Sequence, residues 1–174
     1  EDYNDCSSRY EKALKQRNEL LKTEIVTDAS LFSWNLLLAK YGTKIYQYRR
    51  ELVNEINQKL NDVYHSIADN NDQIKLDYKT EVEDITENKY LKLLENSLDR
   101  DRRIEHTSFG VHKDDFIFQF NGCEADGSAS RGETRSIILA LKFIEAAIIQ
   151  SKTNQKPIVL LDDVFSELDE SRRR

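Results

Sequence analysis

Apolar residues recur at helical spacing through the first part of the chain. From Trp34 to Ile67 they are separated by three or four positions in nine successive steps, which is the period of one face of a helix. This stripe predicts one long helix with a single apolar seam. So narrow a seam packs against one partner helix, and the moderately amphipathic residues 8–24 are expected to fold back on it as an antiparallel hairpin. Thr27–Ser30 supplies capping residues for the turn between them.

The pattern then changes to short strands and shorter helices. Apolar residues alternate over Ile74–Tyr78, which predicts a strand, and helical spacing returns over Tyr90–Leu98. A second strand is predicted over Phe116–Phe120, and it ends at Asn121–Gly122, a dipeptide typical of tight hairpin turns.

The last part of the chain predicts a helix and a buried strand. The helix runs over residues 132–151, and Ile158–Leu161 is a continuous apolar run of the kind found in strands buried on both faces. Strand, helix and buried strand in this order indicate a βαβ-type layer, so we expect an α/β fold here. The whole chain should be mixed α+β and rich in helix, because only 6 of 174 residues are Gly or Pro, against roughly 12% in ordinary proteins.

Charge and cysteine content narrow the possible environments and partners. The net charge of −6 excludes a polybasic nucleic-acid-binding protein, so any contact with nucleic acid must use a local basic patch. Cys6 and Cys123 lack metal-site spacing and are expected to be free thiols in a reducing compartment. The longest apolar stretch, Ile137–Ile149, contains charged residues and is too short to span a bilayer. We therefore expect a cytoplasmic protein without membrane segments, and, since the sequence has no Met, one that begins mid-sequence at Glu1.

Two carboxylates follow the predicted buried strand. Asp162 and Asp163 would lie at its carboxyl end, where open α/β sheets bind ligands. One carboxylate there can hold Mg²⁺ beside a nucleotide phosphate while the other polarises a water molecule. A simple turn at the end of a strand remains an equally good interpretation of this pair alone.

Ser130–Glu133 precedes the predicted helix and has the pattern of a capping box. A Ser and a Gly at a helix start also offer free amides to an anion such as phosphate, and the two interpretations are compatible. About twenty helical residues separate this segment from the apolar run with Asp162–Asp163, and Ser166–Asp169 follows. This is the order of signature, Walker B and D-loop in ABC-type ATPases.

Four blocks in the same order resemble the RecF family, bacterial recombination mediators with an ABC-type ATPase head. The first resembles the family pattern Y-x-x-x-L-K-Q-R-N-x-L-L-K, the third T-T-x-G-P-H-R-D-D, and the fourth L-L-D-D-V-x-S-E-L-D-x-x-R. The blocks are Tyr10–Lys22; Trp34, Tyr41–Gly42 and Arg49; Thr107–Asp115; and Leu160–Arg172.

The chain also departs from the family pattern. Val111 stands where the family usually has Pro, Lys113 where it usually has Arg, and Arg131–Glu133 replaces the commoner Gln-Gly-Gln. The sequence has no G-x-x-x-x-G-K-[ST] loop for the β- and γ-phosphates, which the family carries ahead of the region corresponding to residue 1. The resemblance therefore implies an internal piece, with a helical lid lobe over residues 1–105 and part of an ABC-type ATPase lobe over 106–174.

The resemblance also implies a function. The family binds ATP with Mg²⁺, dimerises on ATP, binds single-stranded and gapped double-stranded DNA, and works with RecR and RecO to load RecA. By the same resemblance, Asp162 would hold Mg²⁺ and Asp163 would act on the attacking water. The signature residues Ser130, Arg131, Gly132 and Glu133 would contact ATP held by the other subunit. Ser166 and Asp169 would lie at the dimer interface. The family is a weak DNA-dependent ATPase, but without the phosphate loop this chain is expected to be inactive alone.

Other assignments are less specific. Lys44, Arg49 and Arg50 on the long helix are candidate DNA contacts. His112–Asp115 matches a family block without an evident chemical role, and a His-Lys pair before a strand is otherwise a surface feature. Another ABC-type head, such as a transporter or SMC protein, and a non-enzymatic helical interaction module remain alternatives. The Q-R-N block and the short helical hairpin favour the RecF family over another ABC-type head, and nucleotide dependence of self-association would separate it from the helical module.

Overall fold

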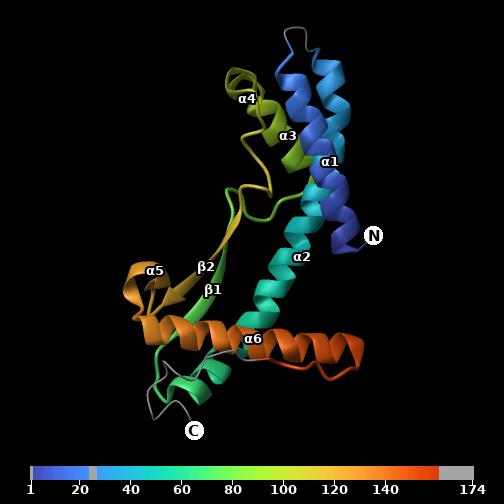
Figure 1. Ribbon diagram of the computed structural model, residues 1–174. Coiled ribbons are helices and arrows are strands. Elements are labelled where there is room, and N and C mark those ends of the chain that lie inside the picture. Colours follow the sequence, from blue (N-terminus) through green and yellow to red (C-terminus); the bar gives the residue numbers. More distant parts are fainter. Residues whose placement is uncertain (1, 24–26, 161–174) are drawn as a thin grey trace. The chain divides into compact units, whose positions relative to one another are not determined.

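The computed structural model describes residues 2–23 and 27–160, which form two compact units (Figure 1). Unit 1 takes its residues from 1–51 and 78–115, and unit 2 from 52–77 and 116–174. Each unit thus combines two separate stretches of the chain. The predicted division into a lid lobe and an ATPase lobe at residue 105 stays a prediction.

The described residues are largely helical, with three short strands. In chain order the elements are α1 (Tyr3–Leu21), α2 (Asp28–Ala68), β1 (Ile74–Lys79), α3 (Glu87–Asn96), α4 (Leu98–Ile104), β2 (Asp115–Phe120), β3 (Cys123–Glu124), α5 (Ala125–Ser128) and α6 (Arg131–Thr153). The helix-rich, mixed composition expected from the sequence is confirmed. No helix in the described ranges is both long and apolar enough to cross a membrane.

Unit 1 is built on the predicted antiparallel hairpin of α1 and the first part of α2 (Figure 1). Arg9 contacts Tyr41 and Arg17 contacts Asn35, so the paired positions run in opposite directions along the two helices. α1 begins at Tyr3 rather than at residue 8, because the carboxylate of Asp2 caps the helix. The predicted cap of α2 is also confirmed, since Thr27 Oγ1 accepts the Ser30 amide at 3.3 Å.

The expectation that the seam of α2 packs against a single partner helix is wrong. α2 has 41 residues and α1 has 19. At about 1.5 Å per residue, the shorter helix cannot cover the longer one. The later part of α2 belongs to unit 2, where Leu52 and Ile56 line an apolar groove with Leu141 and Ile148 of α6.

The core of unit 1 includes residues from α3 and from the segment that follows α4. Tyr90 and Leu94 of α3 are fully buried, and Phe109 and Val111 pack against the same cluster. The first part of the 107–115 segment therefore contributes to the core of unit 1. Both cysteines are free thiols, as predicted; Cys6 is buried in this core and Cys123 is exposed.

The sheet has the strand order β1-β2-β3. β2 and β3 pair antiparallel as a hairpin, in which Phe120 lies opposite Cys123. Asn121 and Gly122 both have positive φ angles, 49° and 84°, as a two-residue hairpin turn of the I′ kind requires. The predicted strands at 74–78 and 116–120 and the turn between β2 and β3 are confirmed.

The predicted strand at Ile158–Leu161 is wrong for the residues that the structure describes. Ile158, Val159 and Leu160 have no regular structure, and Ile158 and Leu160 are 88% and 89% exposed. A strand buried on both faces needs neighbouring strands and covering layers, and the described residues provide none for this segment. The predicted βαβ layer is accordingly not formed within 2–23 and 27–160.

Candidate functional site

Helix α6 begins at the segment predicted to contact phosphate. Ser130 is its N-cap: Ser130 Oγ accepts the Glu133 amide at 3.3 Å, and Glu133 Oε2 accepts the Ser130 amide at 2.6 Å. These reciprocal bonds are the predicted capping box. The inner face of α6 is buried at Ser136, Ile137 and Ala140, which fixes the helix within unit 2 while Ser130 and Arg131 face solvent.

The start of α6 has the chemistry of an anion contact. The first amides of a helix have no carbonyl partner one turn earlier, and the helix dipole places partial positive charge there. In α6 these are the amides of Arg131 and Gly132, beside the exposed side chain of Arg131. The carboxylate of Glu133 already accepts the hydrogen bond of the Ser130 amide. An anion that binds the free amides would therefore also lie near one negative charge.

The other predicted nucleotide-site residues lie outside the described residues. They are Asp162, Asp163, Ser166 and Asp169. Within residues 2–23 and 27–160, no three His, Cys, Asp or Glu side chains converge to hold a metal ion. The start of α6 is therefore the one part of the predicted nucleotide site whose geometry the structure describes.

The candidate DNA contacts on α2 all have partners within the protein. Arg49 is half-buried and donates to the Val111 carbonyl at 2.6 Å and to the Tyr3 hydroxyl at 3.3 Å. Lys44 is half-buried and also has a partner. Of the three, Arg50 is the exposed one.

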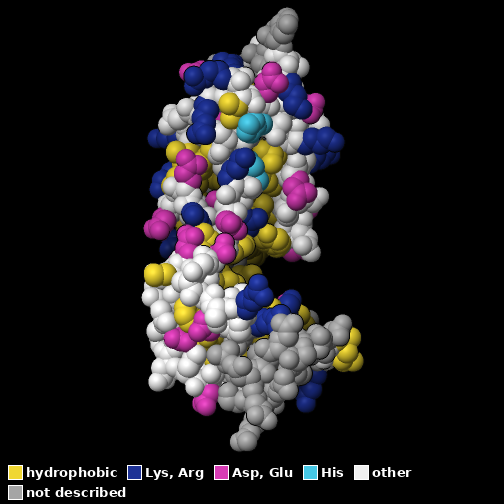
Figure 2. Space-filling model, turned by 60° about the vertical axis from the view of Figure 1, so that its left-hand side comes forward, with side chains coloured by type: hydrophobic (Ala, Val, Ile, Leu, Met, Phe, Trp, Pro, Cys, Tyr) yellow, Lys and Arg dark blue, Asp and Glu magenta, His cyan; other side chains and the backbone are white. Residues whose placement is uncertain are grey.

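Arg50 forms an ion pair with Asp84 and donates to the Tyr46 hydroxyl at 3.1 Å. The hydrogen bond from Arg50 holds the pKa of Asp84 below its ordinary value. On the face of unit 1 shown in Figure 2, basic and acidic side chains are interspersed and do not form separate positive and negative patches.

A buried ion pair that sequence reasoning missed anchors the segment after α4. Arg17 of α1 and Asp101 of α4 are both 0% exposed and lie 2.8 Å apart. Arg17 also donates to Asn35 and to Thr107 Oγ1, each at 2.7 Å. One guanidinium thus joins both helices of the hairpin to α4 and to the Thr107–Asp115 block.

The same block has further bonds at its first two residues. Asn18 Oδ1 accepts both the Thr107 amide, at 2.8 Å, and the Thr107 hydroxyl, at 2.7 Å. Asp101 Oδ1 accepts the Ser108 amide at 2.9 Å and the Ser108 hydroxyl at 2.5 Å, and Asp101 Oδ2 accepts the Ser97 hydroxyl at 3.1 Å. The Q-R-N block on α1 and the Thr107–Asp115 block therefore meet, and their contact is structural.

His112 belongs to this arrangement and is partly buried, so the interpretation of the His-Lys pair as a surface feature is wrong for His112 and holds for the exposed Lys113. Its Nδ1 lies 2.8 Å from the Tyr10 hydroxyl and its Nε2 lies 3.1 Å from the Thr107 carbonyl oxygen. Burial lowers the pKa of His112 below its ordinary value. Asp114 accepts a hydrogen bond from the Tyr78 hydroxyl, while Lys113 and Asp115 are exposed.

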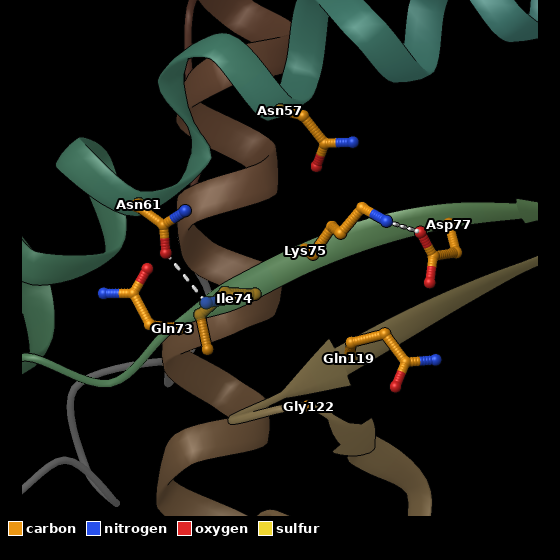
Figure 3. Close-up of a pocket in the computed structure, with 8 residues that line it drawn as sticks. All are labelled: Asn57, Asn61, Gln73, Ile74, Lys75, Asp77, Gln119 and Gly122. Atoms are coloured by element: carbon orange, nitrogen blue, oxygen red, sulfur yellow. Dashed lines mark hydrogen bonds and ion pairs between the residues drawn. The ribbon is translucent and has the colours of Figure 1, made fainter.

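Unit 2 has a groove of ≈ 750 Å³ between α2 and the sheet, and four of its eight lining residues are Asn or Gln (Figure 3). Asn57 pairs with both backbone groups of Leu76: it accepts the amide at 2.8 Å and donates to the carbonyl at 2.7 Å. Asn61 accepts the Ile74 amide at 2.8 Å, and Lys75 pairs with Asp77 (Figure 3). Asn57 and Asn61 thus satisfy backbone groups of β1 that a neighbouring strand would otherwise bond.

Comparison with solved structures defines the class of protein. The chain superposes on a structure of the recombination mediator protein RecF-ATP with a TM-score of 0.88 at 30% identity, over 98% of this chain and 48% of that one. A RecF-ATPrS structure gives a TM-score of 0.86 at the same identity. The fold is therefore that of the RecF ABC-type ATPase.

Sequence relatives define the family. The chain is 35% identical over 171 residues to a DNA replication and repair protein RecF from Agathobacter rectalis, and 36% identical over 180 residues to one from Natranaerobius thermophilus. These matches cover 95% of this chain but 46% and 47% of the relatives. No protein-family model matches. The chain belongs to the RecF family and spans about half the length of the curated relatives it matches.

Proposed function

We propose that this chain is part of an ATP-binding DNA replication and repair protein of the RecF type. In this proposal the start of α6 contacts the γ-phosphate of ATP held by a second copy. The exposed N-cap at Ser130 carries the proposal, because it combines free helix amides with access from outside the molecule. The likeness to a RecF-ATP structure supports ATP as the nucleotide.

The remaining roles follow the order of the motifs. Asp162 would hold Mg²⁺, a hard cation that prefers carboxylate oxygens, and Asp163 would polarise the attacking water. Ser166 and Asp169 would lie at the interface of an ATP-dependent homodimer. One copy cannot complete its own site, so ATP binding and dimerisation would be coupled.

DNA would be the macromolecular partner, as single strands or as gapped duplex, and RecR with RecO would be the protein partners in loading RecA. The pathway named for the solved RecF structures supports this placement. Against a net charge of −6, contact with phosphates would depend on local Lys and Arg side chains, among which Arg50 is exposed on α2.

The test uses a longer protein that carries a Walker A loop ahead of this chain. Ser130→Arg places a bulky cation where the partner's phosphate would arrive, and a two-fold interface repeats the defect at both sites. We expect the variant to bind ATP yet stay monomeric by light scattering. Ser130→Thr is the matched control, because it still caps the helix and should dimerise. An Arg variant that dimerises normally on ATP would reduce Ser130–Glu133 to a capping box.

A further inference from the structure

His112 has a fixed proton arrangement in unit 1. The Thr107 carbonyl oxygen can only accept a hydrogen bond, so the hydrogen of neutral His112 must be on Nε2, 3.1 Å away. Nδ1 is then an acceptor, and the Tyr10 hydroxyl, 2.8 Å away, must donate to it. The backbone contact therefore determines the tautomer.

The direction of hydrogen-bond donation toward His112 continues back through a second tyrosine, Tyr90. The hydroxyls of Tyr10 and Tyr90 are 2.9 Å apart, and Tyr90 accepts the Val111 amide at 3.1 Å. Each hydroxyl thus accepts one hydrogen bond and donates the next. We call this chain from the Val111 amide through Tyr90, Tyr10 and His112 to the Thr107 carbonyl the His112 relay.

The two tyrosines of the His112 relay are buried, and His112 is partly buried. Tyr10 and Tyr90 are 3% and 0% exposed. Gly110, with a φ of 137°, lies so near that a side chain there would overlap both tyrosine hydroxyls. The backbone of the Thr107–Asp115 block can approach the relay this closely because residue 110 is a glycine.

Protonation of His112 would reverse the relay. Nδ1 would become a donor, Tyr10 would have to accept from it, and Tyr10 would then donate to Tyr90. The Tyr90 oxygen would receive hydrogen bonds from both Tyr10 and Val111. Its own hydrogen would have no acceptor among its partners in residues 2–23 and 27–160. A buried donor without a partner costs free energy. The observed packing is therefore less stable when His112 is protonated.

The charged and titratable groups around His112 come from four helices and from its own segment. Burial lowers the pKa of His112, and Lys113 acts in the same direction, while the hydrogen bond to the Thr107 carbonyl and the carboxylates of Asp114 and of Asp101 on α4 oppose it. Tyr10 of α1 and Tyr90 of α3 stay neutral, because burial raises both pKa values, that of Tyr90 to about 12. Arg49 of α2 binds the Val111 carbonyl. Burial outweighs the opposing effects, so His112 is neutral at pH 7.

We propose that the His112 relay is a pH-sensitive switch that holds residues 107–111 against α1 and α3 while His112 is neutral and loosens them when it is protonated. A histidine with a lowered folded pKa stabilises the fold fully above its unfolded value of about 6.5. That stabilisation is lost as the pH falls through 6.5 toward the lower folded value. The switch is independent of nucleotide and of DNA.

The test is urea unfolding of the 174-residue chain at pH 7.5 and pH 5.5. His112→Asn keeps an acceptor near the Nδ1 position and cannot take up a proton, and His106→Asn, at an exposed ring, is the matched control. We expect the midpoint to fall at pH 5.5 in the wild type and in His106→Asn, and to fall much less in His112→Asn. Equal pH dependence in all three proteins would overturn the proposal.

A second measurement does not depend on the folding of a variant. Nitrogen-15 NMR of the wild-type histidine rings should show the Nε2–H form of His112 at pH 7.5 and a titration midpoint below 6.5. Tyr10→Phe removes the donor to Nδ1 and should move that midpoint upward. An Nδ1–H form, or a midpoint at or above 6.5, would contradict the switch.

Discussion

Two polar segments of this chain occupy positions of family motifs, one in the matched block Thr107–Asp115 and one at the divergent signature Ser130–Glu133, and their surroundings differ. In unit 1, Thr107 and Ser108 bond to Arg17, Asn18 and Asp101, and the ion pair beneath them is 0% exposed. In unit 2, Ser130 and Glu133 at the start of α6 bond to each other, and Ser130 and Arg131 are exposed. The first segment has its hydrogen-bonding groups committed to the fold, and the second keeps helix amides available to a ligand.

This difference shows that a matched motif is not by itself a binding site. A buried polar group needs a hydrogen-bond partner within the protein. A group whose hydrogen bonds are all made inside the protein cannot also bind a substrate. The Q-R-N block and the Thr107–Asp115 block contribute to the fold, and the start of α6 is the segment that we propose to contact a ligand.

The largest effect is expected on turnover. In a longer protein with a Walker A loop, Asp163→Asn should abolish ATP hydrolysis and leave ATP binding intact, because the carboxylate would act in the transition state. Asp162→Ala should instead weaken binding of Mg²⁺-ATP. Phosphate release and calorimetry measure the two effects. Small, equal effects for both variants would show that these carboxylates are not the metal site.

The next effect concerns the stability of unit 1. Asp101→Ala leaves the guanidinium of Arg17 buried without its charge partner, and removing one member of a buried pair costs about 3–5 kcal/mol. Urea unfolding of the 174-residue chain measures this loss. Asp99→Asn changes an exposed carboxylate on the same helix and should shift the midpoint little. Similar midpoints for the two variants would mean that the buried network does not stabilise unit 1.

A smaller loss is expected at the start of α6. Ser130→Ala removes the N-cap oxygen and should cost about 1 kcal/mol of unfolding free energy. Ser130→Thr keeps an oxygen at the cap and should restore most of it. A loss as large as that of Asp101→Ala would mean that the cap is as integral to its unit as the buried ion pair is to unit 1.

The smallest effect on stability is expected for Arg50→Ala, because its ion pair with Asp84 is exposed to water and screened by salt. The unfolding midpoint should stay within error of the wild type. In the longer protein, if Arg50 contacts a DNA phosphate, the slope of log affinity against log salt should decrease by roughly one. An unchanged slope would remove Arg50 as a DNA contact.

The sequence predicted the features that depend on neighbouring residues. The stripe on α2, the alternation in β1 and β2, the Asn121–Gly122 turn and the capping box at Ser130 all arise within a few positions of the chain. Local patterns of this kind are determined by backbone geometry and side-chain period, which the sequence displays directly.

Features that depend on distant partners were not predicted. Arg17 and Asp101 are 84 positions apart, and periodicity does not reveal that a charged residue on α1 faces inward. The available signal was the spacing of Ala13, Arg17 and Leu21, which places Arg17 on the buried face of α1. The strand predicted at Ile158–Leu161 was wrong over its described residues for the same reason, because burial of a strand depends on neighbouring strands from distant parts of the chain.

Hydrogen–deuterium exchange of the 174-residue chain at pH 7.5 tests the comparison most directly. The amides of Thr107, Ser108 and Val111 donate to Asn18, Asp101 and Tyr90, so they should exchange slowly although they lie outside helices and strands. The amides of Arg131 and Gly132, at the exposed start of α6, should exchange fast. Fast exchange at all three residues of the first segment, or strong protection of Arg131 and Gly132, would contradict the account.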